Sequence, residues 1–391
     1  MDHLGSGAFS AVPAAASPAL GQMRAQVPEV IAATERLVLC ESPSHDLSAV
    51  RASASVVAQV GTELLGVEPE LVEVEGRTHV RWRFGQQPSR VLVLGHHDTV
   101  WPMGTLQSIP FQTGTHLRGP GCLDMKAGLA LAFRAIANLD DKAGICVLVT
   151  GDEELGSVTS RQLIEAEAAD ATAALVFEAG ADSGALKSAR KGRAHLRLLL
   201  CGRAAHAGLE PEKGANALVA LGNVVRALVD LNALTLGTTV TPTVASAGTS
   251  ANTVADRAEV EVDVRALLAS ELERVVEAAR ALDTEVPGVD VELVGGADRP
   301  PLAEAMSAEL LSRAQRLAQS LGLGEVRGET VGGGSDGNLT AALGVPTLDG
   351  LGAVGGGAHA RDEFVDVALL APRLALATAL LADLTGSAVR A

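Results

Sequence analysis

A short apolar run, residues 91–94, ends in a cluster of polar side chains. Its four residues are all valine or leucine and no helix cap lies nearby, so the run predicts a buried central strand. After a glycine the chain continues with His96, His97 and Asp98. Residues i and i+2 of an extended segment point the same way, so we expect His96 and Asp98 to share a face and His97 to point away. This arrangement is typical of a metal-binding imidazole with a carboxylate beside it, at the strand end where open α/β sheets bind ligands.

Two further apolar runs, residues 144–150 and 173–177, end in the same manner. Glu153 and Glu154 follow the first run, and Glu178 follows the second. Helical patterns separate the predicted strands along the chain. Strands that alternate with helices predict an α/β fold with a mainly parallel sheet.

The pattern changes near residue 192. The expected order there is strand, helix, strand, strand, helix, strand, which is typical of a ferredoxin-like α+β unit. The predicted strands are residues 194–201, 238–247, 253–265 and 289–294, and the predicted helices are residues 214–234 and 270–285. A chain of 391 residues exceeds the size for which one core usually suffices. We therefore expect an α/β domain built from residues 1–191 and 300–391, interrupted by an inserted domain at residues 192–299.

Charge and hydropathy exclude several classes of function. The formal net charge of −16 disfavours nucleic acid and anionic membranes as partners. The N-terminal region has no basic residue before Arg24, and prolines interrupt its apolar run, so no signal peptide is predicted and a cytoplasmic location is expected. Residues 365–384 are apolar but contain charged residues and Pro372, which predicts a core helix and not a membrane span.

The polar residues at the strand ends form a set that suits zinc. Asp124, in the glycine-rich loop 118–128, and His359, in a glycine-rich segment near the C-terminus, extend this set. The candidates are His96, Asp98, Asp124, Glu153, Glu154, Glu178 and His359. Taken singly, each has an ordinary explanation as a solvated or hydrogen-bonded polar residue. Together they favour a metal site, because zinc binds imidazole nitrogen and carboxylate oxygen and because buried acids are costly without cations.

Seven short motifs carry a resemblance to a known family. In chain order they are Gly-His-His-Asp-Thr-Val, Gly-Pro-Gly-Cys-Leu-Asp-Met-Lys-Ala-Gly, Gly-Asp-Glu-Glu, Phe-Glu-Ala-Gly, Gly-Arg-Ala-Ala-His-Ala-Gly, Gly-Gly-Gly-Ser-Asp-Gly-Asn and Gly-Ala-His. From about residue 25 to the end, the chain resembles the co-catalytic di-zinc metallopeptidase and deacylase family. That family includes glutamate carboxypeptidase, acetylornithine deacetylase and succinyl-diaminopimelate desuccinylase. The resemblance is strongest to glutamate carboxypeptidases.

The resemblance implies that residues 1–191 and 300–391 form a zinc-exopeptidase-like catalytic domain and that residues 192–299 form a lid or dimerisation domain. The catalytic domain would hold two zinc ions, for which cobalt can substitute. By this resemblance His96 and Glu178 hold one ion, Glu154 and His359 hold the other, and Asp124 bridges the two. The ions would activate a water molecule that attacks an amide carbonyl.

The same resemblance gives roles to three further residues. Asp98 would orient His96, and Glu153 would act as the general base that takes a proton from water and passes it to the leaving nitrogen. His206, from the inserted domain, would stabilise the oxyanion, often across a dimer. A homodimer that forms through the inserted domain is therefore expected.

Basic residues are expected to set substrate specificity. Arg265 ends an alternating strand, and arginine can hold a carboxylate with two hydrogen bonds, although a surface ion pair is the alternative explanation. In the family pattern its neighbours are Asn252 and Gly334, and Arg299 and Lys187 would add positive charge. We expect a small-molecule or peptide substrate with a free α-carboxylate, from which an acidic amino acid, glutamate, is released. An N-acyl amino acid deacylase is the alternative.

Three other interpretations are weaker. Residues 333–337 match the serine-hydrolase elbow G-x-S-x-G, with Ser335, Asp349 and His359 as the triad, but these residues are closely spaced and no buried strand precedes the serine. Residues 350–355 match G-x-G-x-x-G, but no helix is predicted to begin there. A non-catalytic binding homologue would usually lack a ligand or the base, and neither is missing here.

Overall fold

The computed structural model describes residues 18–86 and 89–390, and the chain divides into two compact units. Unit 1 comprises Met1–Ala189, Glu304–Val331 and Ser335–Ala391, and unit 2 comprises Arg190–Ala303 and Gly332–Gly334. The N-terminal leader, for which no signal peptide was expected, lies outside the described residues up to residue 17.

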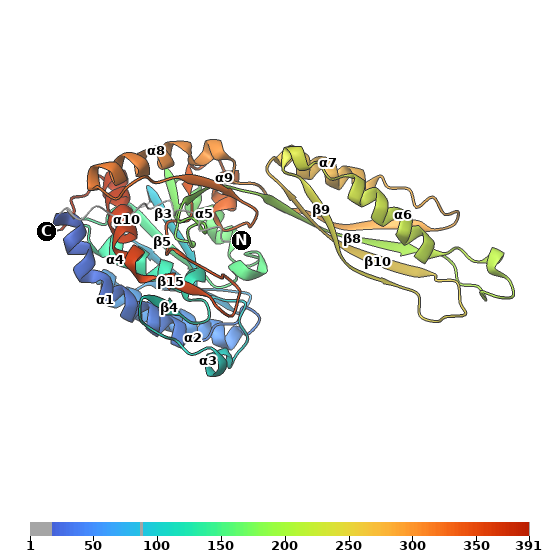
Figure 1. Cartoon of the computed structure of the whole chain (residues 1–391), viewed down its shortest axis with the longest axis horizontal. Coiled ribbons are helices and arrows are strands. Elements are labelled where there is room, and N and C mark those ends of the chain that lie inside the picture. The colour runs from blue at the N-terminus through green and yellow to red at the C-terminus, as the bar shows by residue number, and fades with distance from the viewer. Residues whose placement is uncertain (1–17, 87–88, 391) are drawn as a thin grey trace, which may run out of the picture. The chain divides into compact units, whose positions relative to one another are not determined.

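A six-stranded mixed sheet forms the centre of unit 1 (Figure 1). In spatial order its strands are β1 (Glu70–Val74), β2 (Arg77–Arg83), β5 (Ile145–Thr150), β3 (Val91–His96), β6 (Ala173–Val176) and β13 (Thr347–Leu348). The strands β5, β3, β6 and β13 run parallel, whereas β2 is antiparallel to both β1 and β5. The mainly parallel α/β sheet expected from the sequence is confirmed.

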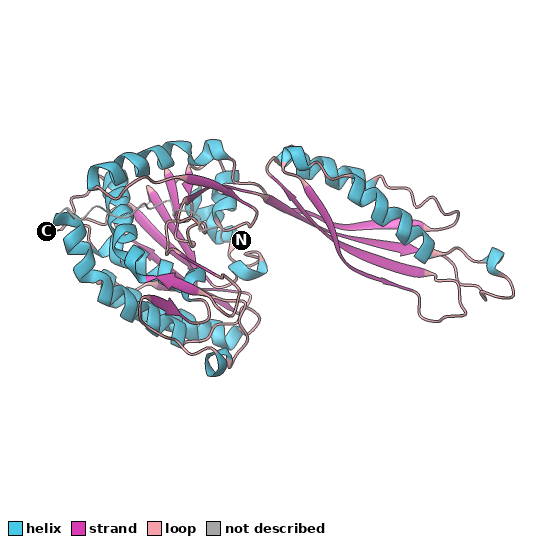
Figure 2. Ribbon diagram, in the orientation of Figure 1, coloured by secondary structure: helices cyan, strands magenta, loops and turns pink. Residues whose placement is uncertain are grey.

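Helices cover both faces of this sheet because β3 is apolar on both sides. Val91 and Val93 pack in a core cluster with one helix layer, and Leu92 and Leu94 pack with another. The first layer contains α1 (Pro18–Leu39), α2 (Leu47–Leu65), α4 (Ala127–Ala137), α8 (Glu304–Leu321) and α10 (Leu370–Thr385), and the second contains α5 (Arg161–Ala168) and α9 (Gly337–Ala342). The alternation along β3 thus places one helix layer on each side (Figure 2).

One stretch in the described part of the chain, Val367–Thr385, is long and apolar enough to cross a membrane. It is 67% buried inside the protein, and its helix α10 packs against α1, α4 and α8. It is a core helix, as the sequence predicted.

Small elements connect the large ones in unit 1. They are α3 (Thr105–Ser108), β4 (His116–Arg118), a π-helical turn (Cys122–Lys126), β7 (Leu186–Arg190), β12 (Gly328–Val331), β14 (Gly355–Gly356) and β15 (Phe364–Asp366). Strands β14, β15 and β4 form a three-stranded sheet. This sheet brings the segment that contains His359 beside the segment that precedes Asp124.

Unit 2 is a four-stranded antiparallel sheet with two helices on one face (Figure 1). Its elements in chain order are β8 (Gly192–Cys201), α6 (Ala217–Asp230), β9 (Thr239–Ala247), β10 (Arg257–Ala266), α7 (Ala269–Arg280) and β11 (Asp290–Arg299). The spatial order β11-β8-β10-β9 is that of a ferredoxin-like unit, as expected. Alternate residues of β8 and β10 are buried beneath the helices, and the opposite sheet face carries charged pairs such as Arg197 with Glu259.

The chain enters and leaves unit 2 at neighbouring positions. The backbone N–H of Arg190 donates to the carbonyl of Leu302 at 3.0 Å, and the N–H of Leu302 donates to the carbonyl of Arg190 at 3.1 Å. Arg190 and Leu302 therefore form an antiparallel pair at the base of the insert.

Candidate metal centre

Three neighbouring parallel strands of unit 1 end at imidazole or acidic residues. His96 is the last residue of β3. Glu153 and Glu154 lie in the 3₁₀ turn Glu153–Leu155 that follows β5, and Glu178 comes shortly after β6. Because adjacent parallel strands end at the same edge of a sheet, these side chains lie close together.

Two loops bring Asp124 and His359 to this edge. Asp124 lies in the π-helical turn before α4. A Cβ atom on Gly128 would lie 2.0 Å from the carbonyl oxygen of Phe177, so only glycine allows the start of α4 to pack directly on the chain after β6. His359 adopts a left-handed backbone conformation with a φ of 62° in the loop between β14 and β15.

The side chains form two imidazole–carboxylate clusters that share Asp124. The Nε2 atom of His96 lies 3.3 Å from Asp124 Oδ1 and 3.3 Å from Glu178 Oε1. The Nε2 atom of His359 lies 3.1 Å from Glu154 Oε1 and 3.4 Å from Asp124 Oδ2. Each oxygen of Asp124 therefore faces a different imidazole.

Burial and mutual attraction shift the pKa values of these groups. Burial disfavours the charged form of His96, but the surrounding carboxylates, that of Asp124 foremost, hold its pKa well above the ordinary value. Hydrogen bonds with Asp124 and Glu154 raise the pKa of His359 to about 10. Burial opposes ionisation of Asp124, yet the two imidazoles hold its pKa far below the usual range, whereas burial raises the pKa of Glu154.

This donor set fits divalent metal ions. Donor atoms of His96, Glu153 and Glu178 lie within 4.8 Å of one another, as do those of His96, Asp124 and Glu154. Imidazole nitrogen and carboxylate oxygen are the donors that zinc prefers in catalytic sites. A partly buried group of acids this dense is costly unless positive charge compensates it, and bound cations supply that charge.

Asp98 supports the centre through hydrogen bonds to the turn after β5 and through contacts with His96. Its Oδ1 accepts from the backbone N–H of Glu153 at 3.2 Å, and its Oδ2 accepts from the N–H of Glu154 at 3.3 Å and from Ser44 Oγ at 2.7 Å. The Nδ1 atom of His96 lies 3.0 Å from the carbonyl oxygen of Asp98 and 3.4 Å from its Oδ1. Donation from Nδ1 leaves Nε2 as the lone-pair atom that faces the acids. His97 points away and contacts the carbonyl of Thr78, as expected from the strand period.

Sequence reasoning missed Glu363, which anchors the Asp124 loop. The buried carboxylate of Glu363 accepts from the backbone N–H groups of Gly121, Leu123 and Asp124 at 2.9, 2.7 and 3.0 Å, and from Trp101 Nε1 at 3.2 Å. Glu363 lies in the same chain segment as His359, so it links the two loops of the centre. The one available signal was an acid four residues after His359.

His206, the expected oxyanion stabiliser, and Asn252, an expected substrate residue, lie together at one end of unit 2. The Nδ1 atom of His206 accepts from the N–H groups of Gly208 and Leu209, each at 3.1 Å, so the neutral ring carries its proton on Nε2. The N–H of Ala207 donates to the carbonyl of Asn252 at 2.9 Å. His206 and Asn252 are therefore neighbours within unit 2.

The other expected substrate residues of unit 2 lie at the opposite end of its sheet. Arg265 pairs in register with Arg193, which also pairs with Arg299, and a Cβ atom on Gly334 would lie 2.8 Å from Arg299 Cδ. The family pattern placed Asn252 beside Arg265. However, Arg257, near Asn252, is eight positions along β10 from Arg265, which is about 27 Å of extended chain.

Arg265 and Lys187 both have partners within their own units. The guanidinium of Arg265 donates to both carboxylate oxygens of Asp263 at 2.8 and 3.0 Å. This is the surface ion pair expected as the alternative explanation for Arg265. Lys187 belongs to unit 1, where its backbone N–H donates to the carbonyl of Asp349 at 2.9 Å.

The structure excludes the serine-hydrolase and dinucleotide interpretations. Ser335 is fully buried and donates to the carboxylate of Asp349, while the Nε2 atom of His359 faces Glu154 and Asp124 instead. The chain after residues 350–355 continues into β14 and not into a helix. Neither site geometry is present in the described part of the chain.

Comparison with known proteins identifies the family and the fold. The profile of peptidase family M20/M25/M40 matches residues 92–383. The chain is 30% identical over 372 residues to carboxypeptidase G2 of Pseudomonas sp. (strain RS-16), which covers 91% of this chain and 89% of that protein. Among solved structures, aminopeptidase PepT from Bacillus cereus has a TM-score of 0.71 at 22% identity, covering 94% of this chain and 99% of that chain. An M20 family metallo-carboxypeptidase from Sulfolobus solfataricus has a TM-score of 0.71 at 18% identity, covering 90% and 98%.

Unit 1 carries imidazoles and carboxylates at the carboxyl edge of a mainly parallel sheet, and a ferredoxin-like unit is inserted into its chain. Together with the family match, these features define a metal-dependent hydrolase. The chain belongs to peptidase family M20/M25/M40. The family resemblance found in the sequence motifs is therefore confirmed.

Proposed function

We propose that this protein is a zinc-dependent carboxypeptidase that releases a C-terminal acidic amino acid, glutamate, from N-acyl or peptidyl substrates. The observation that carries the proposal is the pair of imidazole–carboxylate clusters that share Asp124, with Glu153 next to them. The 30% identity to carboxypeptidase G2 favours a carboxypeptidase over the deacylase alternative. The protein is expected to act in the cytoplasm.

Five residues would hold the metal ions. His96 and Glu178 are proposed for one zinc ion, Glu154 and His359 for the other, and Asp124 for both, because its two oxygens face different imidazoles. Bound zinc supplies Lewis-acid polarisation of a carbonyl group and lowers the pKa of water. Cobalt offers a similar coordination preference and is expected to substitute.

Glu153 is proposed as the general base. Its backbone N–H is held by Asp98, which fixes the turn from which its carboxylate reaches the donor atoms of His96 and Glu178. In that position the carboxylate can accept a proton from water and pass it to the leaving amide nitrogen. Its partner in sequence, Glu154, faces His359 instead.

The substrate carboxylate is assigned to the basic end of unit 2. Arg265 is proposed to hold the α-carboxylate with two hydrogen bonds, as it now holds Asp263, so the substrate must compete with that acid. Arg299 beside Gly334 adds a second guanidinium at the same end of the sheet, which favours a dicarboxylic leaving group. Lys187 is a further proposed contributor of positive charge.

His206 and Asn252 are proposed to act on a substrate bound by a second copy of the chain. Within unit 2 they lie about 27 Å along β10 from Arg265, which exceeds the size of an amino acid. The Nε2–H of His206 is free of the turn that fixes Nδ1, so it can donate to a developing oxyanion. A homodimer through the exposed edge of β9 would protect that edge from other strands.

The test is a panel of N-acyl amino acids and dipeptides, measured with added zinc or cobalt. Acylglutamates should be hydrolysed fastest, and amidation of the α-carboxylate should abolish turnover. Arg265→Ala should raise KM by about tenfold or more, as loss of a charge-assisted bidentate contact does. Arg197→Ala removes another ion-paired arginine from the same sheet face and serves as the matched control.

The competing outcomes separate the alternatives. Faster hydrolysis of N-acetylornithine or N-succinyl-diaminopimelate than of any acylglutamate would assign a deacylase and leave the metal chemistry in place. Bound metal without hydrolysis of any substrate would assign a non-catalytic binding homologue.

A further inference from the structure

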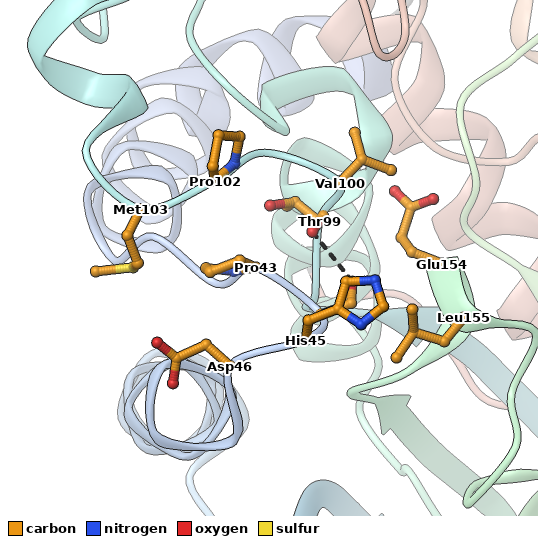
Figure 3. A pocket seen from close by; sticks show the side chains of 10 residues that line it. Pro43, His45, Asp46, Thr99, Val100, Pro102, Met103, Glu154 and Leu155 are labelled. Atoms are coloured by element: carbon orange, nitrogen blue, oxygen red, sulfur yellow. Dashed lines mark hydrogen bonds between the residues drawn. The ribbon is translucent and has the colours of Figure 1, made fainter.

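A cavity of about 450 Å³ lies in unit 1 next to the metal centre. Its wall comes from three segments: the turn before α2, the chain after β3, and the 3₁₀ turn after β5. The third segment contributes Glu154 (Figure 3), and Glu154 Oε1 lies 3.1 Å from the Nε2 atom of His359. The cavity therefore shares a side chain with the candidate catalytic site.

Backbone hydrogen bonds fix the walls relative to β3. The N–H of Thr99 donates to the carbonyl of Ser42 at 2.8 Å, and the N–H of Ser44 donates to the carbonyl of Thr99 at 3.1 Å. The N–H of Asp46 closes the turn on the carbonyl of Pro43 at 2.9 Å. Because these segments are paired with the strand end that carries His96, the cavity is preformed beside the metal centre.

Apolar side chains dominate the lining. They are Pro43, Val100, Pro102, Met103 and Leu155. Val100 is 45% exposed and Met103 is 57% exposed, and both line the cavity from the chain segment after β3 (Figure 3). Exposed apolar groups beside a catalytic centre are typical of a ligand-binding surface.

Polar groups in the lining already have structural partners. The carboxylate of Asp46 caps α2 by accepting from the N–H groups of Ser48 and Ala49, and Ser44 Oγ donates to Asp98. His45 also lines the cavity, and Figure 3 shows its ring beside Leu155. Among the residues that the structure describes, no lysine or arginine lines this cavity, so these residues supply no side-chain cation for a carboxylate.

We propose that this cavity binds the acyl group on the carbonyl side of the scissile amide and selects extended apolar acyl chains. The proposal rests on the proposed function, in which the α-carboxylate is held by Arg265 of unit 2. An N-acyl amino acid has two ends, and the end without a carboxylate matches a lining without a fixed cation. Acyl chains that carry a carboxylate, such as succinyl, are bound less well because that charge would lose water without gaining a partner.

The test compares kcat/KM for N-hexanoyl-, N-acetyl- and N-succinyl-glutamate on the zinc-loaded protein. Four additional methylene groups in an apolar cavity should favour hexanoyl over acetyl by about tenfold or more. Val100→Phe fills the cavity and should lower the hexanoyl-to-acetyl ratio by about tenfold. Met103→Lys adds an ammonium group to the wall and should raise the succinyl-to-hexanoyl ratio. Val67→Phe makes the same change at a valine that is 47% exposed and does not line the cavity, and it should leave all ratios unchanged.

The outcomes distinguish this inference from the proposed function. The acyl-binding role of the cavity would be overturned if kcat/KM were equal for hexanoyl and acetyl substrates and if neither Val100→Phe nor Met103→Lys changed the substrate ratios. Hydrolysis of acylglutamates in the same experiment would still support the proposed carboxypeptidase activity. Failure of the metal-loaded protein to hydrolyse any acylglutamate would overturn the proposed function, and the inference with it. Because Met103 is more than half exposed, Met103→Lys should fold even if Val100→Phe does not.

Discussion

Asp124 joins the two halves of the metal centre, because each of its oxygens faces a different imidazole. If it bridges two ions, Asp124→Ala should lower the metal content of both positions, whereas His359→Ala should mainly empty one. Metal counting by mass spectrometry after dialysis checks this, with the exposed Asp170→Ala as control. Two tightly bound ions per chain in Asp124→Ala would refute the bridge.

Glu153 is expected to act on water and not to hold a metal ion. Glu153→Gln should therefore keep both ions and lose activity by about a hundredfold or more, which is the range for removal of a general base. Parallel measurements of kcat and metal content check the assignment. Loss of an ion from Glu153→Gln would make this residue a ligand, which its proximity to His96 and Glu178 also allows.

The residues of the centre could be predicted from sequence where the strand period fixes them. His96 and Asp98 share a face because they are two residues apart, and His97 points away for the same reason. Ser44 and Glu363 could not be predicted this way. They contact Asp98 and the Asp124 loop through tertiary packing across 54 and 239 residues, and no local pattern encodes such a distance.

At the scale of elements, the loop between β14 and β15 carries both His359 and the anchor of the Asp124 loop. Glu363→Gln replaces an acceptor of several N–H groups by an amide that also donates, so the loop at residues 121–124 should lose its position. We expect metal affinity to fall by about 10- to 100-fold, as for other groups that orient ligands.

A metal titration of Glu363→Gln, read together with its thermal unfolding, checks this positioning role. The exposed Glu325→Gln is the control. If the variant were destabilised but bound metal with wild-type affinity, Glu363 would have a structural role only and would not position the metal ligands.

Element boundaries were less predictable than element types. The strand β10 begins at Arg257, four residues later than expected, because the preceding residues pair with the loop that contains His206. Helix α6 begins only after Asn216, whose side chain accepts from Leu218 and Val219 N–H groups. Both element boundaries depend on specific hydrogen bonds, which hydrophobic periodicity does not predict.

At the scale of the whole molecule, the separation of His206 from Arg265 within unit 2 predicts sharing between subunits. When Glu153→Gln and His206→Ala chains exchange freely, half of the dimers are hybrids and each hybrid has one intact site. Activity should then recover to about a quarter of the wild-type level.

Activity after mixing, with subunit exchange followed by differently tagged chains, checks this sharing. Mixing each variant with itself supplies the baseline. Persistent inactivity after demonstrated exchange would mean that each chain uses its own His206.

The antiparallel pair of Arg190 and Leu302 gives the insert entry and exit points that lie side by side. Everything between them behaves as a cassette: it can lengthen, shorten or be exchanged without stretching the chain that forms the metal-binding unit. The cassette contains Arg265, Arg299 and the strand edge proposed for subunit pairing, and the metal centre lies outside it. Substitutions within this one contiguous stretch are therefore expected to change the preferred leaving group while the metal centre stays unchanged.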